Sequence, residues 1–314
     1  DGKEYQIKSK VVVNATGVFV DDVMKMDECE TRRKVRPSQG VHLVVDSKFL
    51  GGHSALMIPK TKDGRVLFGV PWHGKVVLGT TDTPLNEASL EPRALEEEVD
   101  FILDQAGQYL DRKPTRADVL SVFAGLRPLA APTHADSKKT KEISRNHKIY
   151  RSKSGLLTIT GGKWTTYRAM AEDVINQAIV IGGLSPAECV TKNLRVHGYT
   201  KEQFDENDWN YVYGSDADKI QKMIEKEPSF AEKLHEGYTF TAAHVVWAAR
   251  EEFAQNIEDV LARRVRMLFL DARAALKIAP KVASVLAAEL GKDKTWEQAQ
   301  IADFNRLARG YILN

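Results

Sequence analysis

The stretch Leu156-Leu157-Thr158-Ile159-Thr160-Gly161-Gly162-Lys163-Trp164-Thr165-Thr166-Tyr167-Arg168 decides the fold of this chain. Its first five residues are an apolar, partly β-branched run that predicts a buried strand, and residues 168–182 have the spacing of an amphipathic helix that stops at Gly182-Gly183. The octapeptide 161–168 therefore forms a strand-to-helix turn. Backbone N–H groups and the positive dipole end at such a turn suit an anionic or electron-rich ligand.

The octapeptide is not a phosphate-binding P-loop. That motif requires a glycine at position 157 and Ser or Thr directly after the lysine, and this chain has Leu157 and Trp164 there. Glycine at 161 and 162 permits a close backbone approach to a flat ligand, and Thr165 and Thr166 can cap the helix while offering a hydroxyl outward. An ordinary Gly-rich turn with an exposed lysine explains the same residues equally well.

A second strand, turn and helix begin the chain. Residues 5–13 predict a strand, Asn14-Ala15-Thr16-Gly17 predicts a turn, and an apolar stretch to Met26 predicts a helix. This order describes the carboxyl end of a strand in a doubly wound sheet, where ligands bind. The sequence contains no G-x-G-x-x-G fingerprint.

The middle of the chain predicts a mostly antiparallel sheet, because short β-rich runs between residues 35 and 85 are each bounded by Gly, Pro or Asp. A helix over 92–111, a strand from Val119 to Leu126 and a hairpin of 149–151 with 156–160 follow. The polar segment 133–148, with Lys138, Lys139 and Lys141, is expected to be an exposed loop.

From about residue 190 the β signals fade, and apolar periodicity predicts an all-helical module of roughly 120 residues. The expected helices are 216–227, 241–253, 256–261, 271–290 and 295–312, with Thr241 as an N-cap. The fold class is therefore α+β: a mostly antiparallel sheet with part of a ligand-binding α/β domain, followed by an all-helical domain.

Composition narrows the classes of protein. The 314 residues carry 45 Lys and Arg against 43 Asp and Glu, a net charge of +2 without a basic stripe, so no nucleic-acid partner is expected. No apolar run approaches the roughly 18 residues of a membrane span. Cys29 and Cys189 are isolated, which predicts no disulfide framework and no metal site and fits a reducing, cytosolic compartment.

Three side chains are candidates for chemistry. Strand alternation puts His42 on the face opposite Val41 and Leu43, although a lone histidine on a sheet is more often structural. Arg127 is the one cation in the segment 123–129, and its fork suits a phosphate or carboxylate as well as a structural ion pair. Lys163 is open to the same two interpretations.

Other polar residues favour plainer roles. Asp82 follows a strand and predicts an Asx-type turn cap, and His73 is expected at an exposed hairpin tip. Arg263, Arg264 and Arg266 form a basic cluster on a helix, which is usually a solvated or ion-paired face.

Five motifs, taken together and in order, resemble the FAD-dependent glycerol-3-phosphate dehydrogenases, and the resemblance spans nearly the whole chain. The motifs are 14–17, 40–45, 79–83, 123–129 and 161–168, and the terminal module matches that family's helical C-terminal domain, notably at 259–264. The resemblance implies a division into a remnant of the FAD-binding domain (1–34), a β-rich substrate-binding domain (35–155), a return to the FAD-binding domain (156–188) and a helical domain (189–314).

The resemblance also implies a reaction. The family oxidises sn-glycerol 3-phosphate to dihydroxyacetone phosphate, hydride passes from C2 to the N5 atom of FAD, and electrons continue to membrane quinone or, in the oxidase branch, to oxygen. Arg127 would bind the substrate phosphate or polarise its oxygens, Lys163 would approach flavin and substrate, and His42 would be the general base at the C2 hydroxyl, a task that suits a free imidazole pKa of about 6.5. The residues implied to contact the cofactor are Asn14, Ala15, Thr16, Gly17, Gly125, Gly162, Thr165 and Thr166.

One departure from the family pattern is large. The N-terminal Gly-rich FAD fingerprint and the substrate arginine that follows it are absent, so the chain resembles the C-terminal part of the enzyme, and we expect it to bind neither FAD nor substrate tightly by itself. The expected location is cytoplasmic, peripheral to the inner face of the cell membrane, and the pattern is compatible with membrane contact and with a homodimer. The alternatives are a related oxidase acting on glycerol 3-phosphate or another small substrate, and a non-catalytic fragment whose helical module docks a partner or a membrane.

Overall fold

The structure is a computed structural model that describes residues 3–29, 32–131, 146–202, 205 and 208–313. Its strands are β1 (Val13–Asn14), β2 (Val35–Asp46), β3 (Leu56–Ile58), β4 (Leu67–Trp72), β5 (Lys75–Gly79), β6 (Thr83–Pro84), β7 (Ser121–Ala130), β8 (Lys148–Arg151) and β9 (Leu157–Thr160). Its α-helices are α1 (Val20–Asp27), α2 (Glu96–Gly107), α3 (Tyr167–Ile181), α4 (Ala217–Lys226), α5 (Ala242–Glu251), α6 (Met267–Leu270), α7 (Ala272–Leu290) and α8 (Lys294–Ala308).

The chain divides into two compact units, each assembled from three separate segments. The first unit contains Asp1–Gly40, Asp82–Pro92 and Gly125–Arg195, and the second contains Val41–Thr81, Arg93–Ala124 and Val196–Asn314. Strands β2 and β7 contribute residues to both units.

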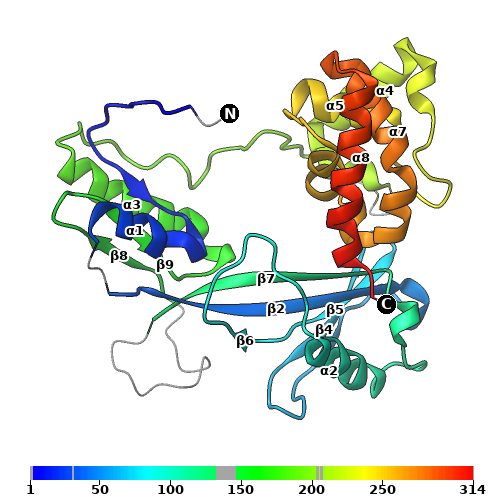
Figure 1. Ribbon diagram of the computed structural model, residues 1–314, viewed down its shortest axis with the longest axis horizontal. Coiled ribbons are helices and arrows are strands. Elements are labelled where there is room, and N and C mark those ends of the chain that lie inside the picture. The colour runs from blue at the N-terminus through cyan, green and yellow to red at the C-terminus, as the bar shows by residue number, and fades with distance from the viewer. Residues whose placement is uncertain (1–2, 30–31, 132–145, 203–204, 206–207, 314) are drawn as a thin grey trace. The chain divides into compact units, whose positions relative to one another are not determined.

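The first unit is organised around a three-stranded sheet of order β1-β9-β8, in which β1 runs parallel to β9 and β8 runs antiparallel to it. Helices α1 and α3 lie beside these strands (Figure 1). Their contact buries a small core of Leu157, Ile159, Val174 and Ala178. The helix α3 ends at Gly182, as the sequence predicts.

The larger sheet has six strands in the order β3-β4-β5-β2-β6, with β7 also paired to β2. The pairings of β2 with β5 and with β6, of β3 with β4 and of β4 with β5 are antiparallel, which confirms the prediction for residues 35–85. Helix α2 contributes Val99, Ile102, Leu103 and Ala106 to the core that forms against β2, β4 and β5. The buried residues of α2 recur at helical spacing because only one face of the helix meets the sheet.

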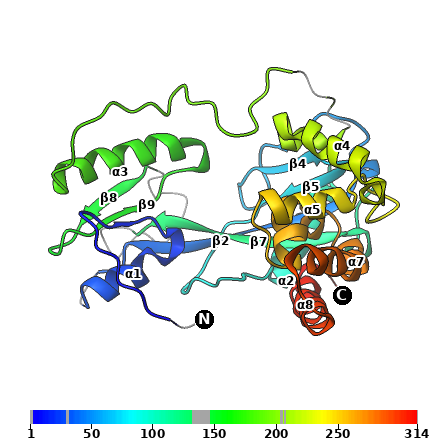
Figure 2. The ribbon, with the colours of Figure 1, turned by 90° about the horizontal axis from the view of Figure 1, so that it is seen from above.

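The helices after residue 196 form a core of their own. Helices α7 and α8 pack side by side, and α5 packs against α7 (Figure 2). Buried residues such as Leu261, Leu268 and Leu286 fill the space between them. Thr241 caps α5 as expected, and its backbone N–H donates to His244 in a capping box.

Two sequence expectations differ from the structure, and two others are not tested by the described residues. The predicted strand at residues 5–13 is wrong within the described part of the chain, because only Val13 pairs with a neighbouring strand while Tyr5 and Ile7 are exposed. The predicted helix at 256–261 is present from Ile257, but it takes the π-helical form at Asp259–Arg264. The predicted loop at 133–148 lies outside the described residues up to position 145, and the domain boundaries of the sequence analysis stay a prediction.

Across the described residues, no helix is both long and apolar enough to cross a membrane. The same residues contain no cluster of three or more His, Cys, Asp or Glu side chains that could hold a metal ion.

Candidate functional site

Two strand-to-helix turns lie at one edge of the three-stranded sheet. Strands β1 and β9 are parallel neighbours, with Val13 opposite Leu157 and Asn14 opposite Thr158. Their carboxyl ends therefore meet at the same edge, and each strand runs through a glycine turn into a helix, α1 or α3. In α/β sheets this edge is where ligands bind.

The first turn is held by Asn14, which is buried. Its amide nitrogen donates to the carbonyl oxygen of Val20 at 2.9 Å and to Thr158 Oγ1 at 3.2 Å, and its Oδ1 accepts from Thr16 Oγ1 at 2.7 Å. The Asn14 side chain thus joins β1, β9 and α1. Ala15 and Thr16 are exposed, and a Cβ added at Gly17, whose φ is +62°, would meet nothing within 4 Å.

The second turn contains the octapeptide, and glycine is required there for packing. Gly162 has a φ of +75°, and a Cβ at this position would collide with the sulfur of Met170. At Gly161, with φ +77°, a Cβ would lie 2.9 Å from the carbonyl oxygen of Asn146. These two glycines fit α3 and β8 closely together, so their presence does not depend on a ligand.

The octapeptide side chains after the glycines are exposed. The backbone of Lys163 is extended. The Thr166 hydroxyl closes the turn, because it accepts a hydrogen bond from the N–H of Lys163 at 3.2 Å and donates one to the carbonyl oxygen of Lys163 at 3.0 Å. Thr165 is exposed, and Trp164, 86% exposed, stacks on Tyr167 with ring centroids 5.5 Å apart. Thr166 stands at the N-cap position of α3 but makes no side-chain cap hydrogen bond to that helix, so the predicted capping by the threonines is wrong, and an outward hydroxyl stays a prediction for the exposed Thr165.

The last residue of the octapeptide turns along α3. Arg168 Nη1 donates to Glu172 Oε2 at 2.7 Å, and this hydrogen bond lowers the pKa of the Glu172 carboxyl. The same nitrogen lies 3.1 Å from Thr191 Oγ1. Arg168 therefore serves the structure of α3.

Arg127, on β7, lies against a glycine of β2. A Cβ at Gly40 would sit 2.7 Å from Cζ of the guanidinium, so only glycine leaves room for it. Nη1 of Arg127 is 3.6 Å from Oδ1 of Asp82, which also accepts a hydrogen bond from the hydroxyl of Ser38. The predicted turn cap at Asp82 stays a prediction, and its carboxylate has the further role of pairing with Arg127.

His42 lies in the second unit on β2, paired across the ladder with Gly79. Its ring stacks on Phe123 with centroids 5.2 Å apart, and a Cβ at Gly79 would lie 3.0 Å from its Cγ. His42 is half-buried while Val41 and Leu43 are fully buried, which confirms the predicted alternation of faces.

The predicted site residues are divided between the units. All eight predicted cofactor contacts belong to the first unit, together with Arg127 and Lys163, and His42 belongs to the second. Gly125, on β7, is exposed and has no atom within 4 Å of a Cβ added to it. Sequence reasoning missed the importance of Gly40 and Gly79, and glycine inside a strand was the signal that could have found them.

The prediction of an exposed hairpin tip at His73 is only partly correct. Trp72 and Lys75 pair across a two-residue turn, but His73 is half-buried and stacks on Tyr211 with ring centroids 5.8 Å apart. Trp209 contacts the same imidazole at 5.1 Å between centroids. The tip is therefore seated on the segment that precedes α4.

Two family models match the chain. The model described as FAD dependent oxidoreductase matches residues 1–168, and the one described as the C-terminal domain of alpha-glycerophosphate oxidase matches residues 157–297. The two matches follow one another along the chain and together span most of it.

Named relatives agree with these models. The chain is 39% identical to the mitochondrial glycerol-3-phosphate dehydrogenase SDP6 of Arabidopsis thaliana, over 96% of this chain and 52% of that protein. It is 35% identical to the mitochondrial glycerol-3-phosphate dehydrogenase of Homo sapiens, over 96% of this chain and 44% of that protein. The chain thus spans about half the length of the curated relatives it matches.

A solved structure shares the fold. The glycerol-3-phosphate dehydrogenase of Bacillus halodurans, solved in complex with FAD, superposes with a TM-score of 0.80 at 27% identity. The alignment covers 97% of this chain and 63% of that one. The α+β fold class with its helical C-terminal region is thereby confirmed.

Proposed function

The chain belongs to the FAD-dependent oxidoreductases, and from that premise we propose that it forms part of an enzyme that oxidises sn-glycerol 3-phosphate to dihydroxyacetone phosphate. The observation that carries this proposal is the match, over 97% of the chain, to a solved FAD complex named glycerol-3-phosphate dehydrogenase. The membership itself confirms the family resemblance of the five sequence motifs.

The edge shared by β1 and β9 suits a flavin in its chemistry. Hydroxyls of the exposed Thr16 and Thr165, the cation of Lys163 and open space at Gly17 offer polar groups and room for a flat ring at this edge, and Gly125, on β7, is assigned to the cofactor by the family resemblance alone. Gly162 and Thr166 would support the turn at this edge of the sheet, and Asn14 would hold Ala15 and Thr16 in position. When bound, FAD supplies a hydride acceptor, and the chain supplies the groups that position the substrate and take its proton.

We assign Arg127 to the substrate phosphate. Its guanidinium is a flat fork suited to phosphate oxygens, and Asp82 with Ser38 fixes its direction. The side chain is 36% exposed, so part of the fork remains accessible. Lys163 would add a second positive charge near the reacting atoms.

We assign His42 to the proton of the C2 hydroxyl. FAD would accept the hydride from C2 and its bonding electron pair, while the His42 imidazole would take the proton of the C2 hydroxyl, so that the alcohol would become a ketone. Stacking on Phe123 and the lack of a side chain at Gly79 keep the ring in one orientation. Fixed orientation is what a general base needs.

Substitutions in the complete enzyme test these assignments. We expect Arg127→Ala to lower kcat/KM for glycerol 3-phosphate about 100-fold, since charge-assisted bonds to the phosphate are lost, and His42→Ala to lower it at least about 100-fold. Arg306→Ala, at an exposed arginine paired to Asp303, is the matched control and should change nothing. Values for both site variants within about threefold of the parent would refute the assignment.

We further propose that the 314-residue chain alone binds FAD weakly and is inactive, because its sequence contains no Gly-rich fingerprint for the cofactor's pyrophosphate. The purified chain should lack the visible absorbance of a flavin after gel filtration with added FAD. Stoichiometric flavin in the protein peak would refute this statement and leave the substrate assignment intact.

The electron acceptor follows from the family resemblance. We propose membrane quinone, with the enzyme peripheral to the cytoplasmic face of the membrane as a monomer or homodimer. Oxygen is the second candidate, because the model that matches residues 157–297 is described from an alpha-glycerophosphate oxidase. Substrate-dependent quinone reduction without hydrogen peroxide supports the first acceptor, and stoichiometric hydrogen peroxide supports the second.

A further inference from the structure

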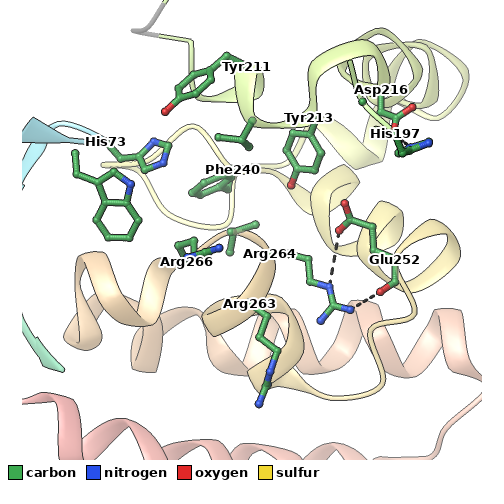
Figure 3. Close-up of a pocket in the computed structure, with 14 residues that line it drawn as sticks. His73, His197, Tyr211, Tyr213, Asp216, Phe240, Glu252, Arg263, Arg264 and Arg266 are labelled. Carbon is green, nitrogen blue, oxygen red and sulfur yellow. Dashed lines mark hydrogen bonds and ion pairs between the residues drawn. The ribbon is translucent and has the colours of Figure 1, made fainter. Parts of the chain in front are cut away.

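A cavity of about 650 Å³ lies wholly within the second unit, between the tip of the β4–β5 hairpin and the helical segment. Figure 3 shows the aromatic rings of His73, Tyr211, Tyr213 and Phe240 on one side and three arginines on the other. This volume falls within the range of small-molecule sites. None of its lining residues is among the predicted cofactor or catalytic residues.

The aromatic side is fixed by local backbone geometry. Gly214, with φ +53°, ends the Tyr211–Tyr213 segment, and a Cβ there would lie 2.9 Å from the carbonyl carbon of Gly198. The N–H of Ser215 donates to the Gly198 carbonyl oxygen at 3.0 Å. Tyr213 is therefore held by backbone contacts that do not involve its own hydroxyl.

The Tyr213 hydroxyl is buried without a hydrogen-bond partner among the described residues, and the residue is only 8% exposed. Figure 3 shows the hydroxyl pointing toward the space between Phe240 and Arg264. Burial, and the neighbouring Glu252 carboxylate, raise the pKa of Tyr213, so the hydroxyl stays protonated and is available as a donor. A buried donor without an acceptor is costly, and a bound acceptor would remove that cost.

The three arginines of the cavity differ in their partners. Arg263 pairs with Glu258 at 2.5 Å and Asp259 at 3.2 Å, and Arg264 pairs with Asp259 at 3.5 Å. Arg266 has no carboxylate within ion-pair distance in the part of the chain that the structure describes. Arg266 is thus the cation of this cavity whose charge remains uncompensated.

Two cavity residues are held in a conformation that side chains rarely adopt. His73 has φ +47° and Arg266 has φ +59°, both in the left-handed region. The two-residue hairpin turn itself requires the left-handed φ of His73, so only Arg266 counts here: a non-glycine residue in this region costs of order 1 kcal/mol, and such residues gather at ligand sites. Burial and, to a smaller extent, the charge of Arg266 lower the pKa of His73, which favours the neutral ring that suits stacking.

We propose that this cavity binds a small planar anion, a ring bearing a carboxylate or phosphate, with the anionic group on Arg266, an acceptor atom on the Tyr213 hydroxyl and the ring among His73, Tyr211 and Phe240. The remaining charged side chains facing the cavity are Arg263, Arg264 and Glu252, and Asp216 with its partner His197. Because Asp216 also pairs with Lys219 at 2.8 Å and Glu252 faces Arg264, the two carboxylates are compensated and do not repel the ligand.

The first test compares three probes by isothermal titration calorimetry on the intact protein. Naphthalene-2-carboxylate has ring and charge, 2-naphthylmethanol has the same ring without charge, and inorganic phosphate has charge without the ring. We expect the carboxylate to bind saturably and at least tenfold more tightly than either of the others. Equal affinity of the carboxylate and the alcohol, or no saturable binding of the carboxylate, overturns the proposal.

Variants then locate the binding. Arg266→Asn removes the charge but keeps a residue that tolerates left-handed backbone, and we expect affinity for the carboxylate to fall about tenfold. Tyr213→Phe removes only the hydroxyl, so affinity should fall about threefold to tenfold while Tm stays equal or rises. Arg306→Asn, outside the cavity, is the matched control for charge.

The two variants also separate a ligand site from a structural role. Loss of Tm in Tyr213→Phe would show that the hydroxyl supports the fold, and binding unchanged in Arg266→Asn would show that the anion binds elsewhere. Either result overturns the proposal. Neither depends on flavin content or on turnover of glycerol 3-phosphate, so the outcome is independent of the proposed function.

Discussion

Glycines determine where Arg127 and His42 can lie. Gly40 faces the guanidinium of Arg127 and Gly79 faces the ring of His42, each at a distance that excludes a Cβ. The sequence could identify both functional candidates by residue type and by family motif. It could not show what faces them, because that depends on the register of β2 against its neighbours, which is set by the whole sheet.

His244 is a buried histidine whose role is structural. It is 3% exposed, its Nδ1 accepts the N–H of Thr241 at 3.0 Å, and its Nε2 lies 2.8 Å from Oδ1 of Asn210. Burial lowers the pKa of His244 to about 4. The native state therefore keeps the ring neutral, whereas the unfolded chain takes up a proton below a pH of about 6.5.

This difference predicts a pH dependence of stability. Stability from His244 is fully present above the unfolded pKa and is lost as the pH falls toward 4, by about 2 kcal/mol between pH 7 and pH 5. His244→Gln retains a side chain that can form the capping box but cannot take up a proton. Between pH 7 and pH 5 we expect its free energy of unfolding, measured in urea, to fall by about 2 kcal/mol less than that of the parent. The exposed His53→Gln is the control, and an unchanged pH slope in His244→Gln would contradict the assignment.

At the scale of elements, helix starts were the most predictable feature. Thr241 begins α5 as the sequence indicated, and α7 and α8 begin one residue after Asp271 and Asp293, whose carboxylates cap them. Caps are local, so a sequence reveals them. The π-helical form of the turn at 259–264 was not predictable, because apolar spacing over six residues does not distinguish its bond from the Val265 N–H to the Val260 carbonyl oxygen from an α-helical bond.

The two aspartate caps are expected to differ in strength. Asp271 accepts the Ala274 N–H at 2.9 Å and also the hydroxyl of Tyr238 at 2.9 Å, whereas Asp293 accepts only the Trp296 N–H, at 2.8 Å, among the bonds found for described residues. We expect Asp271→Ala to lower the free energy of unfolding by about 2–3 kcal/mol and Asp293→Ala by about 1 kcal/mol. Urea unfolding followed by circular dichroism measures both, and equal losses would show that the Tyr238 bond contributes nothing.

At the scale of the whole molecule, the two units differ in the size of their cores. Helix α3 buries two of its residues, Val174 and Ala178, while α7 buries nine. The three-stranded sheet beside α3 has a correspondingly small core. The order of the motifs revealed which segments share a function, but the segments that assemble into each unit are separated by long stretches of chain, and single-sequence patterns do not reveal such contacts.

Hydrogen exchange should report this difference. We expect amides in the middle of α3 to open at free energies about 2 kcal/mol or more below those of α7, because fewer apolar contacts break when α3 opens. Exchange measured residue by residue under native conditions gives both values. Equal protection of the two helices would mean that the units open together as one cooperative structure.

The hairpin tip at His73 has a consequence for synthesis of the chain on the ribosome. The hairpin is local and forms within microseconds of its emergence, but the rings it stacks on, Trp209 and Tyr211, come about 140 residues later. At the usual rate of about 5–20 residues per second, Trp72 and His73 wait roughly seven to thirty seconds without their partners. During that interval the nascent chain presents an aromatic tip that a chaperone can hold, and slowing translation between residues 80 and 209 should lengthen its exposure in proportion.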